Sequence, residues 1–318
     1  MSHLKKFIAL GMTVVTVAGL MPVTSLAAVS GWVEEDGKWY FYSSGRKEKY
    51  KTVYESGLQG YYLLNGRGER VTGKKGLYTT KYMMSAYGDK VKFKRSYYLN
   101  EDGSVLDQKW KKIDGKYYYF GYSGIMTKAS SAEKIDKETG KLVYYLLGND
   151  GARITKKGWH QVTYKGFEPV YGNIKSTKYW YYVKSDGTLQ TGLKKIKGKY
   201  YLFNSSGCLI QNGACKLDNG KTYVADKNGE RIKKKGWVSV KRKESGKHSS
   251  TTYSETITYW YYLKSDSTCV TGWKKLDGKW YYFSPYRSTA CTVAMYNKET
   301  GKYDNYYFNS KGICRNYK

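Results

Sequence analysis

The residues of this chain that could carry chemistry are aromatic, and they recur in one short pattern. Residues 271–283 read Thr-Gly-Trp-Lys-Lys-Leu-Asp-Gly-Lys-Trp-Tyr-Tyr-Phe, and variants return at 31–41, 109–120 and 192–203. Short repeats of this kind stack on their neighbours, because a single repeat cannot bury its apolar face alone. An array usually presents a repeated binding surface, so we expect non-covalent binding at aromatic positions rather than one catalytic pocket.

Titratable groups suited to catalysis are scarce. His160 and His248 are the only histidines after residue 27, and no Ser-His-Asp, metal-ligand or paired-carboxylate spacing surrounds them. An active site requires a cluster of such groups, so we expect no enzyme, no catalytic residue, no cofactor and no metal site.

The cysteines suggest no metal site either, because their spacings match no metal motif. They are Cys208, Cys215, Cys269, Cys291 and Cys314. An odd number leaves at least one thiol unpaired within a single chain. Cys208 and Cys215 are close enough in sequence to pair across a hairpin, and free thiols throughout are the equal alternative.

The elements that position the aromatics are expected to be β-hairpins. The aromatic run occurs eleven times, and Asp-Gly or Asn-Gly pairs mark many of the turns. These pairs supply the positive φ angles that two-residue hairpin turns need, and no helical periodicity interrupts the pattern. The second position of the run is always tyrosine, which we interpret mainly as core because it persists where other aromatics are lost. These tyrosines are Tyr40, Tyr62, Tyr97, Tyr118, Tyr145, Tyr181, Tyr201, Tyr223, Tyr261, Tyr281 and Tyr306.

The hairpins are grouped in threes. Equivalent starts at Trp32, Trp110, Leu193 and Trp273 lie roughly 80 residues apart, which gives three triplets and a truncated fourth. The third hairpin of each full triplet is expected to carry a long insertion that forms an extended arm. Such arms add contact surface or, equally, are tolerated loop growth. The insertions span residues 78–95, 160–179 and 238–259.

The first residues indicate export. Residues 1–27 are interpreted as a signal peptide and residues 28–318 as the repeat array. Lys5 and Lys6 precede an apolar run from Phe7 to Leu20, and Ala27 ends a small-x-small cleavage site. The run is shorter than the about 20 residues of a membrane span, which makes an uncleaved anchor the weaker alternative. We therefore expect a secreted chain without a membrane span, which is released unless it binds something outside the cell.

The chain is strongly basic, with 56 Lys and Arg against 26 Asp and Glu and a formal net charge of +30. Such a field favours polyanionic partners, which outside a cell are phosphate-bearing wall polymers, acidic polysaccharides or anionic lipid surfaces. Lysines on exposed strands also block edge pairing, which accounts for part of the charge without any partner. Because export separates the chain from nucleic acid, no nucleic-acid partner is expected.

The layout of Gly-Trp, six residues, Trp-Tyr-Tyr-Phe and a turn glycine resembles the choline-binding and glucan-binding cell-wall repeats of Gram-positive bacteria. The resemblance covers about residues 30–318 and is strongest at the hairpins of Trp32, Trp110 and Trp273. It implies an all-β fold, a solenoid of stacked β-hairpins wound as a left-handed superhelix, here with three long hairpin insertions. It also implies attachment to choline on teichoic acids, to glucans or, as in large clostridial toxins, to host glycans.

The resemblance further implies ligand cages between consecutive hairpins. In choline-binding members, one hairpin supplies the Trp after glycine and the first aromatic of the run, and the next hairpin supplies a third ring. Such faces attract a quaternary ammonium by roughly 0.5 to 2 kcal/mol per ring, and they also offer flat area to a sugar ring. Leu77, Leu193 and Ala214 replace the tryptophan, so their hairpins should lack a full cage. The implied ligand-binding residues are Trp32 and Trp39 with Tyr61 or Tyr62, Trp110 and Tyr117 with Tyr144 or Tyr145, Trp159 and Trp180 with Tyr200 or Tyr201, Trp237 and Trp260 with Trp280 or Tyr281, and Trp273 and Trp280 with Tyr306.

We favour a non-catalytic, secreted protein that binds choline-decorated or anionic wall polymers or glucans through these aromatic sites. One alternative is an adhesin or toxin-like binder of host glycans, and a less supported one is a wall-modifying enzyme. The positive charge repels free choline at long range, which shifts the expected contact towards a polyanionic polymer or glycan. Contacts inside a cage survive screening, because the Debye length is about 8 Å at physiological ionic strength.

Overall fold

The protein folds almost entirely into β-strands. A computed structural model describes residues 30–86, 89–168, 173–248, 251–284, 292–297 and 302–317. Within these ranges there is one short 3-10 helix, η2 (Tyr122–Gly124), and no α-helix. The all-β prediction is confirmed. The expected signal peptide, residues 1–27, lies outside the described residues, and the left-handed winding stays a prediction.

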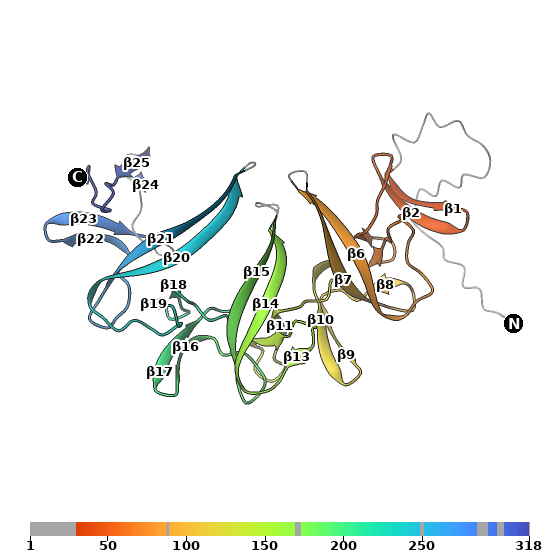
Figure 1. Ribbon diagram of the computed structural model, residues 1–318, viewed down its shortest axis with the longest axis horizontal. Coiled ribbons are helices and arrows are strands. Elements are labelled where there is room, and N and C mark those ends of the chain that lie inside the picture. Colours follow the sequence, from red (N-terminus) through yellow and green to blue (C-terminus); the bar gives the residue numbers. More distant parts are fainter. Residues whose placement is uncertain are drawn as a thin grey trace. The chain divides into compact units, whose positions relative to one another are not determined.

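Contacts divide the chain into two compact units, residues 1–130 with 147–153 and residues 131–146 with 154–318. The first unit holds β1 (Gly31–Glu35), β2 (Lys38–Ser43), β3 (Arg46–Lys47), β4 (Thr52–Glu55), β5 (Gly60–Leu63), β6 (Gly76–Ala86), β7 (Asp89–Leu99), β8 (Ser104–Val105), β9 (Lys109–Ile113) and β10 (Lys116–Phe120), shown in Figure 1. The later strands, mostly in the second unit, are β11 (Ser130–Ile135), β12 (Leu142–Leu147), β13 (Arg153–Ile154), β14 (Gly158–Glu168), β15 (Asn173–Val183), β16 (Gly192–Ile196), β17 (Lys199–Phe203), β18 (Gly213–Lys216), β19 (Thr222–Ala225), β20 (Gly236–His248), β21 (Thr251–Leu263), β22 (Gly272–Leu276), β23 (Lys279–Phe283), β24 (Thr292–Asn297) and β25 (Lys302–Tyr307).

Each aromatic run forms the second strand of an antiparallel hairpin. The hairpins of the first triplet are β1–β2, β4–β5 and β6–β7, and those of the second are β9–β10, β11–β12 and β14–β15. The third triplet comprises β16–β17, β18–β19 and β20–β21, and β22–β23 and β24–β25 follow it. Each hairpin is named first, second or third by this order within its triplet.

The third hairpins are the long ones, as expected. In β14–β15 the pairing runs without a break from Gly158 opposite Val183 to Glu168 opposite Asn173. The pairs β6–β7 and β20–β21 are likewise continuous over 11 and 13 residues per strand, and all three appear as the longest ribbons in Figure 1. The prediction of three long hairpin insertions is confirmed, because the described residues of each insertion extend the two strands.

The Asp-Gly turns are of two kinds, which the sequence did not separate. At Asp36 and Gly37 both φ angles are positive (48° and 71°), as a two-residue hairpin turn requires. At Asp102 and Gly103 the glycine has a φ of 79°, whereas Asp102 accepts a hydrogen bond from the backbone N–H of Ser104 at 2.9 Å. The second kind is an Asx-type loop that leaves the hairpin and leads towards the next one.

Backbone hydrogen bonds from these loops join consecutive hairpins. The N–H of Arg70 donates to the carbonyl of Trp39 at 2.7 Å, and that of Leu209 donates to the carbonyl of Trp180 at 2.8 Å. The N–H of Cys314 donates to the carbonyl of Trp280 at 2.8 Å. Each acceptor is the first aromatic residue of a run. The bond therefore holds the loop of the next hairpin against the strand that carries this residue.

The recurrent tyrosines divide into two groups by burial. Tyr62, Tyr97, Tyr181, Tyr223 and Tyr261 are at most 9% exposed and belong to the core. Tyr40, Tyr118, Tyr145, Tyr201, Tyr281 and Tyr306 are half-buried. The interpretation of this position as core therefore holds for the second and third hairpins more than for the first.

The thiols are not joined within the described residues. Cys208, Cys215, Cys269 and Cys314 are free, so the pairing suggested for Cys208 and Cys215 is not formed, and Cys291 lies outside the described residues. Burial raises the pKa of Cys269 to about 12 and that of Cys208 to about 11. Both side chains therefore act as small apolar groups at neutral pH.

Candidate ligand-binding cages

Strand register brings two tryptophans together in each of two third hairpins. Trp237 lies opposite Tyr262 and Ser239 opposite Trp260, so the two indoles are diagonal neighbours on one face of β20–β21. Their centroids are 6.4 Å apart at an interplanar angle of 79°. In β14–β15, Trp159 and Trp180 repeat this arrangement at 6.5 Å and 80°. Both pairs were expected from the sequence.

The following first hairpin supplies the third ring. Tyr281 lies 5.2 Å from Trp237 at 67°, and Tyr201 lies 4.9 Å from Trp159 at 69°. In both places this ring is the recurrent second tyrosine of the run. The sequence allows Tyr200 or Tyr201 as the third ring of the Trp159 site, and of these two Tyr201 meets Trp159, although the recurrent tyrosine is interpreted mainly as core. Tyr200 instead faces lysines, with the Nζ of Lys233 4.7 Å from its ring centroid.

The three rings of the later site line an open cavity. Trp237, Trp260 and Tyr281 surround a volume of about 320 Å³, together with Ser310 and Lys311. The indole of Trp260 is 46% exposed, so one wall of the cavity is reachable from solvent. The lysine at the rim adds a positive charge next to aromatic faces that attract cations or sugar rings. We call this site the Trp237 cage and its counterpart the Trp159 cage.

The expected cage of Trp273, Trp280 and Tyr306 is present but contains a side chain of the protein itself. Tyr306 lies 4.9 Å from Trp273 at 68°, as predicted. The ring of Tyr317 stacks on Trp280 at 4.1 Å and 24°, and it lies 4.5 Å from Trp273. Tyr317 thus occupies the space between the rings that were expected to hold a ligand.

The expected site at Trp32 and Trp39 is built differently. Trp32 is only 6% exposed and packs with Val53 and Tyr62 in a core cluster that Trp39 covers. Tyr62, not Tyr61, contacts Trp32, at 6.2 Å and 89°.

Tyr61 lies elsewhere, 5.1 Å from Tyr54 and 5.8 Å from Tyr122. The guanidinium carbon of Arg70 lies 3.7 Å from the ring centroid of Tyr62, a contact that the spacing of the aromatic residues does not predict.

The remaining expected site combines residues of both compact units and stays a prediction. Trp110 lies in the first unit, 5.3 Å from Tyr119, and Tyr117 is 45% exposed, with the Nζ of Lys112 5.8 Å from its ring centroid. Tyr144 lies in the second unit, where its carbonyl accepts the N–H of Leu189 at 2.7 Å.

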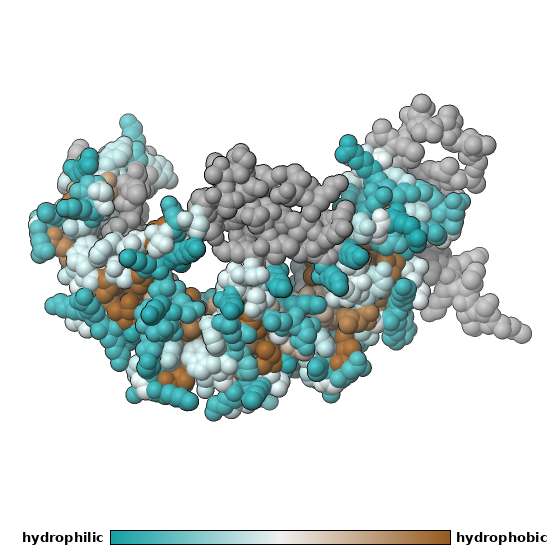
Figure 2. Space-filling model, viewed as in Figure 1, coloured by the Kyte–Doolittle hydropathy of each residue, from teal (hydrophilic) through white to brown (hydrophobic). Residues whose placement is uncertain are grey.

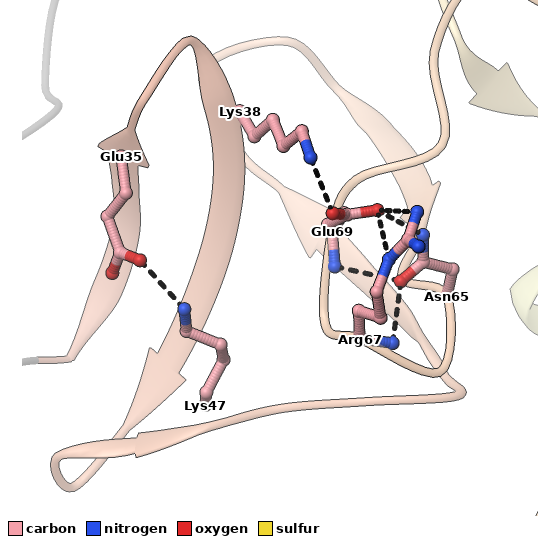
Figure 3. Close-up of polar contacts among 6 residues, drawn as sticks. All are labelled: Glu35, Lys38, Lys47, Asn65, Arg67 and Glu69. Carbon is pink, nitrogen blue, oxygen red and sulfur yellow. Dashed lines mark hydrogen bonds and ion pairs between the residues drawn. The ribbon is translucent and has the colours of Figure 1, made fainter.

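Charged side chains fasten the first hairpin of a triplet to the second. Figure 3 shows Glu69 bound by Lys38 (2.9 Å), Asn65 (2.8 Å) and Arg67 (2.9 Å), and the nearby pair of Glu35 and Lys47. Hydrogen bonds from Asn65, Lys38 and Arg67 lower the pKa of Glu69 to about 2. Lys199 and Glu230, 2.6 Å apart, repeat the Lys38–Glu69 contact in the third triplet.

The surface seen in Figure 2 is mostly hydrophilic over the described residues, with small separate hydrophobic patches. Among the described residues, no group of three or more His, Cys, Asp and Glu side chains could hold a metal ion. No helix within the described ranges has the length and apolar composition needed to cross a membrane.

Comparison with known proteins identifies the repeat. The choline-binding family model named "Putative cell wall binding repeat" matches residues 30–45, 108–126, 191–207 and 271–285. These segments contain the first hairpins of the four triplets. The resemblance to cell-wall-binding repeats is thereby confirmed, and the second and third hairpins are the more divergent ones.

Two curated relatives are enzymes, and the chain matches only a small part of each. The chain is 31% identical to glucosyltransferase-S of Streptococcus mutans serotype c over 268 residues, covering 79% of this chain and 15% of that protein. It is 25% identical to glucosyltransferase-I of Streptococcus downei over 273 residues, covering 78% and 16%. The chain therefore spans about 15% of the length of these relatives.

A crystal structure of choline-binding protein F from Streptococcus pneumoniae, obtained in the presence of a peptidoglycan analogue, is also similar. It is 20% identical and covers 90% of this chain and 92% of that chain, with a TM-score of 0.32.

Proposed function

We propose that this chain, which carries cell-wall-binding repeats, is a secreted, non-catalytic protein that attaches to wall polymers through the Trp237 and Trp159 cages. The observation that carries the proposal is the open cavity between Trp237, Trp260 and Tyr281. Its aromatic geometry recurs at Trp159, Trp180 and Tyr201. Repeated geometry at two junctions supports binding of a polymer whose ligand groups also repeat.

The lining of the cavity suggests the class of ligand. Three aromatic faces favour a quaternary ammonium or the C–H face of a sugar, and Lys311 favours an adjacent anion. Choline on a phosphate-bearing teichoic acid combines a cation with an anion. A glucan is the second candidate, and the similarity to two glucosyltransferases supports it.

Several weak sites on one chain would act together on a polymer. Once one cage is occupied, the second ligand group binds at a high effective concentration, so overall retention exceeds the affinity of either cage. The net charge of +30 adds attraction to anionic polymers that salt screens. Retention should therefore have a cage component, released by free ligand, and a charge component, released by salt.

Sedimentation with purified walls tests the proposal. Three solids are compared, namely walls bearing choline, walls without choline and an insoluble glucan, and bound protein is eluted first with choline and then with salt. We expect retention on at least one solid, and loss of most of it in the double variant Trp159→Ala/Trp237→Ala. Tyr307→Ala is the matched control, because this exposed ring lies outside both cages.

Two outcomes would contradict the proposal. One is a wild-type chain that stays in solution with all three solids at low salt. The other is a double variant that is folded and retained as well as the control. Soluble wall fragments released in proportion to protein and time would contradict the non-catalytic part.

A further inference from the structure

An arginine recurs at one place in each full triplet. Arg70, Arg153 and Arg231 each stand two residues after the loop glycine of a second hairpin, roughly 80 residues apart. The tryptophan pattern does not account for these arginines. At Arg70 and Arg231 the backbone N–H joins consecutive hairpins, donating at 2.7 Å to the carbonyls of Trp39 and Tyr200.

The side chain of Arg70 lies against the rings of the first junction. Its guanidinium carbon is 3.7 Å from the centroid of Tyr62 and 5.8 Å from that of Trp32. One Nη2 hydrogen bond, at 3.3 Å, reaches the carbonyl of Asp102 in the loop after the third hairpin. Arginine stays charged in proteins, so a permanent cation faces these rings. A cation over a ring face is the contact that an aromatic cage offers to a cationic ligand.

Arg231 repeats this arrangement. Its guanidinium carbon is 4.6 Å from the centroid of Tyr223, and its Nη2 donates to the carbonyl of Asp266 at 2.5 Å. Here Leu193 stands where the first triplet has Trp32, and it packs against the cluster that contains Tyr223. This junction therefore has the internal cation without the tryptophan.

The Trp159 cage differs from the Trp32 junction at this same position. Leu209 donates its N–H to the carbonyl of Trp180 at 2.8 Å, just as Arg70 donates to Trp39 at 2.7 Å. Both residues also form the equivalent bridge, Leu64 with Arg70 and Phe203 with Leu209. One backbone position thus carries a cation at the Trp32 junction and a neutral side chain at the Trp159 cage.

We propose that Arg70 determines ligand specificity by acting as an internal cation that closes the Trp32 junction to cationic ligands. Leucine at the equivalent position leaves the Trp159 cage available. The inference rests on the proposed function, because it concerns which junctions of the array bind. Arg231 has the same contacts at a junction without tryptophan, so its removal creates no site.

Calorimetric titration with choline chloride at fixed ionic strength tests the inference by counting sites. Arg70→Leu should bind one more choline per chain than the wild type. Arg231→Leu, which loses the same charge and the same kind of carbonyl contact, should bind the wild-type number. Adding Trp32→Ala to Arg70→Leu should remove the extra site. Circular dichroism and the melting temperature report whether each variant is folded.

A folded Arg70→Leu variant with the wild-type number of sites would overturn the inference, as would an equal gain in Arg231→Leu. If Arg70→Leu does not fold, the Leu209→Arg variant tests the inference instead. It should bind one choline fewer per chain than the wild type. An unchanged number of sites overturns the inference. The proposed function fails through a different result, namely a folded Trp159→Ala/Trp237→Ala double variant that binds choline and walls as the wild type does.

Discussion

Trp237 and Tyr281 lie 5.2 Å apart at an angle of 67°, although they come from consecutive hairpins that belong to different triplets. Trp159 and Tyr201 repeat the relationship at 4.9 Å and 69°. In both places the tryptophan belongs to a long third hairpin and the tyrosine to the first hairpin that follows. The Trp237 and Trp159 cages thus lie at boundaries between triplets, whereas charged contacts such as Lys38 with Glu69 fasten hairpins within one triplet.

The exposed wall of the Trp237 cage allows binding to be separated from folding. Trp260 is 46% exposed, so Trp260→Ala removes a cage ring without opening the core. We expect an affinity loss of about tenfold at this site, within the range that one ring contributes, and little change in melting temperature. Calorimetry with choline or a soluble glucan fragment measures it against Tyr307→Ala. Equal affinities for the two variants would show that the cavity is not a binding site.

The charge of Lys311 distinguishes two kinds of ligand. It lines the Trp237 cage, so Lys311→Glu replaces a rim cation with an anion. We expect tighter binding of free choline and weaker retention on phosphate-bearing walls, each by a few-fold, because exposed charge pairs contribute up to about 1 kcal/mol. Lys227→Glu, in the equivalent loop of the third triplet, is the control for net charge at the Trp237 cage. Identical effects of the two variants on this cage would mean that only the overall charge matters.

Much of this architecture could be predicted from the sequence, because hairpin signals are local. The Trp and turn spacing predicted the hairpins, and the pairs Trp159 with Trp180 and Trp237 with Trp260 follow from strand register alone. The third ring could not be assigned in this way. The tyrosine at the second position of the aromatic run is the same in every repeat, so the sequence predicts a core residue each time. Whether its ring packs into the core or faces a cage depends on the hairpin that precedes it.

The side chains that fill junctions were also missed, for a different reason. Arg70 contacts rings on its own hairpin and on the preceding one, and that meeting depends on how the hairpins stack. Tyr317 reaches Trp273 and Trp280 from outside any strand. The recurrence of arginine once per triplet was nevertheless visible in the sequence and could have been used.

The network of hydrogen bonds and ion pairs at Glu69 should make stability depend on pH. Its pKa is about 2 in the folded chain, below the about 4.3 of an unfolded glutamate. A depressed pKa contributes stability above pH 4.3, and this contribution is lost as the pH falls from about 4.3 to about 2. Glu69→Gln should therefore show a smaller drop in melting temperature between pH 5 and pH 2.5 than the wild type.

The control for this measurement is Glu138→Gln, which removes an exposed carboxylate from the turn between β11 and β12. It should keep the wild-type pH dependence. If Glu69→Gln follows the wild-type curve at every pH, the network contributes nothing to stability.

Gly207, in the loop after β16–β17, packs closely against Leu189 in the loop after the preceding hairpin. Its φ is +84°, and a Cβ there would lie 2.7 Å from the Cβ of Leu189. Gly198 has the same kind of backbone, at +85°, but open space around it. Gly198→Ala should cost about 1 to 2 kcal/mol for the left-handed conformation. Gly207→Ala should cost about 1 to 3 kcal/mol more for the clash. Urea unfolding measures both, and equal losses would contradict the close packing.

Tyr317 fills the last cage, and its removal should make that cage available. Its ring stacks on Trp280 at 4.1 Å and contacts Trp273 at 4.5 Å, which are the faces that a ligand would use. Tyr317→Ala should add one choline site with an affinity similar to that of the Trp237 cage, and it should increase quenching of tryptophan fluorescence by acrylamide. The double variant Trp273→Ala/Tyr317→Ala is the matched control, because it lacks both the occupant and a wall. If a folded Tyr317→Ala chain binds no extra choline, Tyr317 is packed against the cage without blocking it. The same conclusion follows if the extra site persists in the double variant, because that site then does not use Trp273.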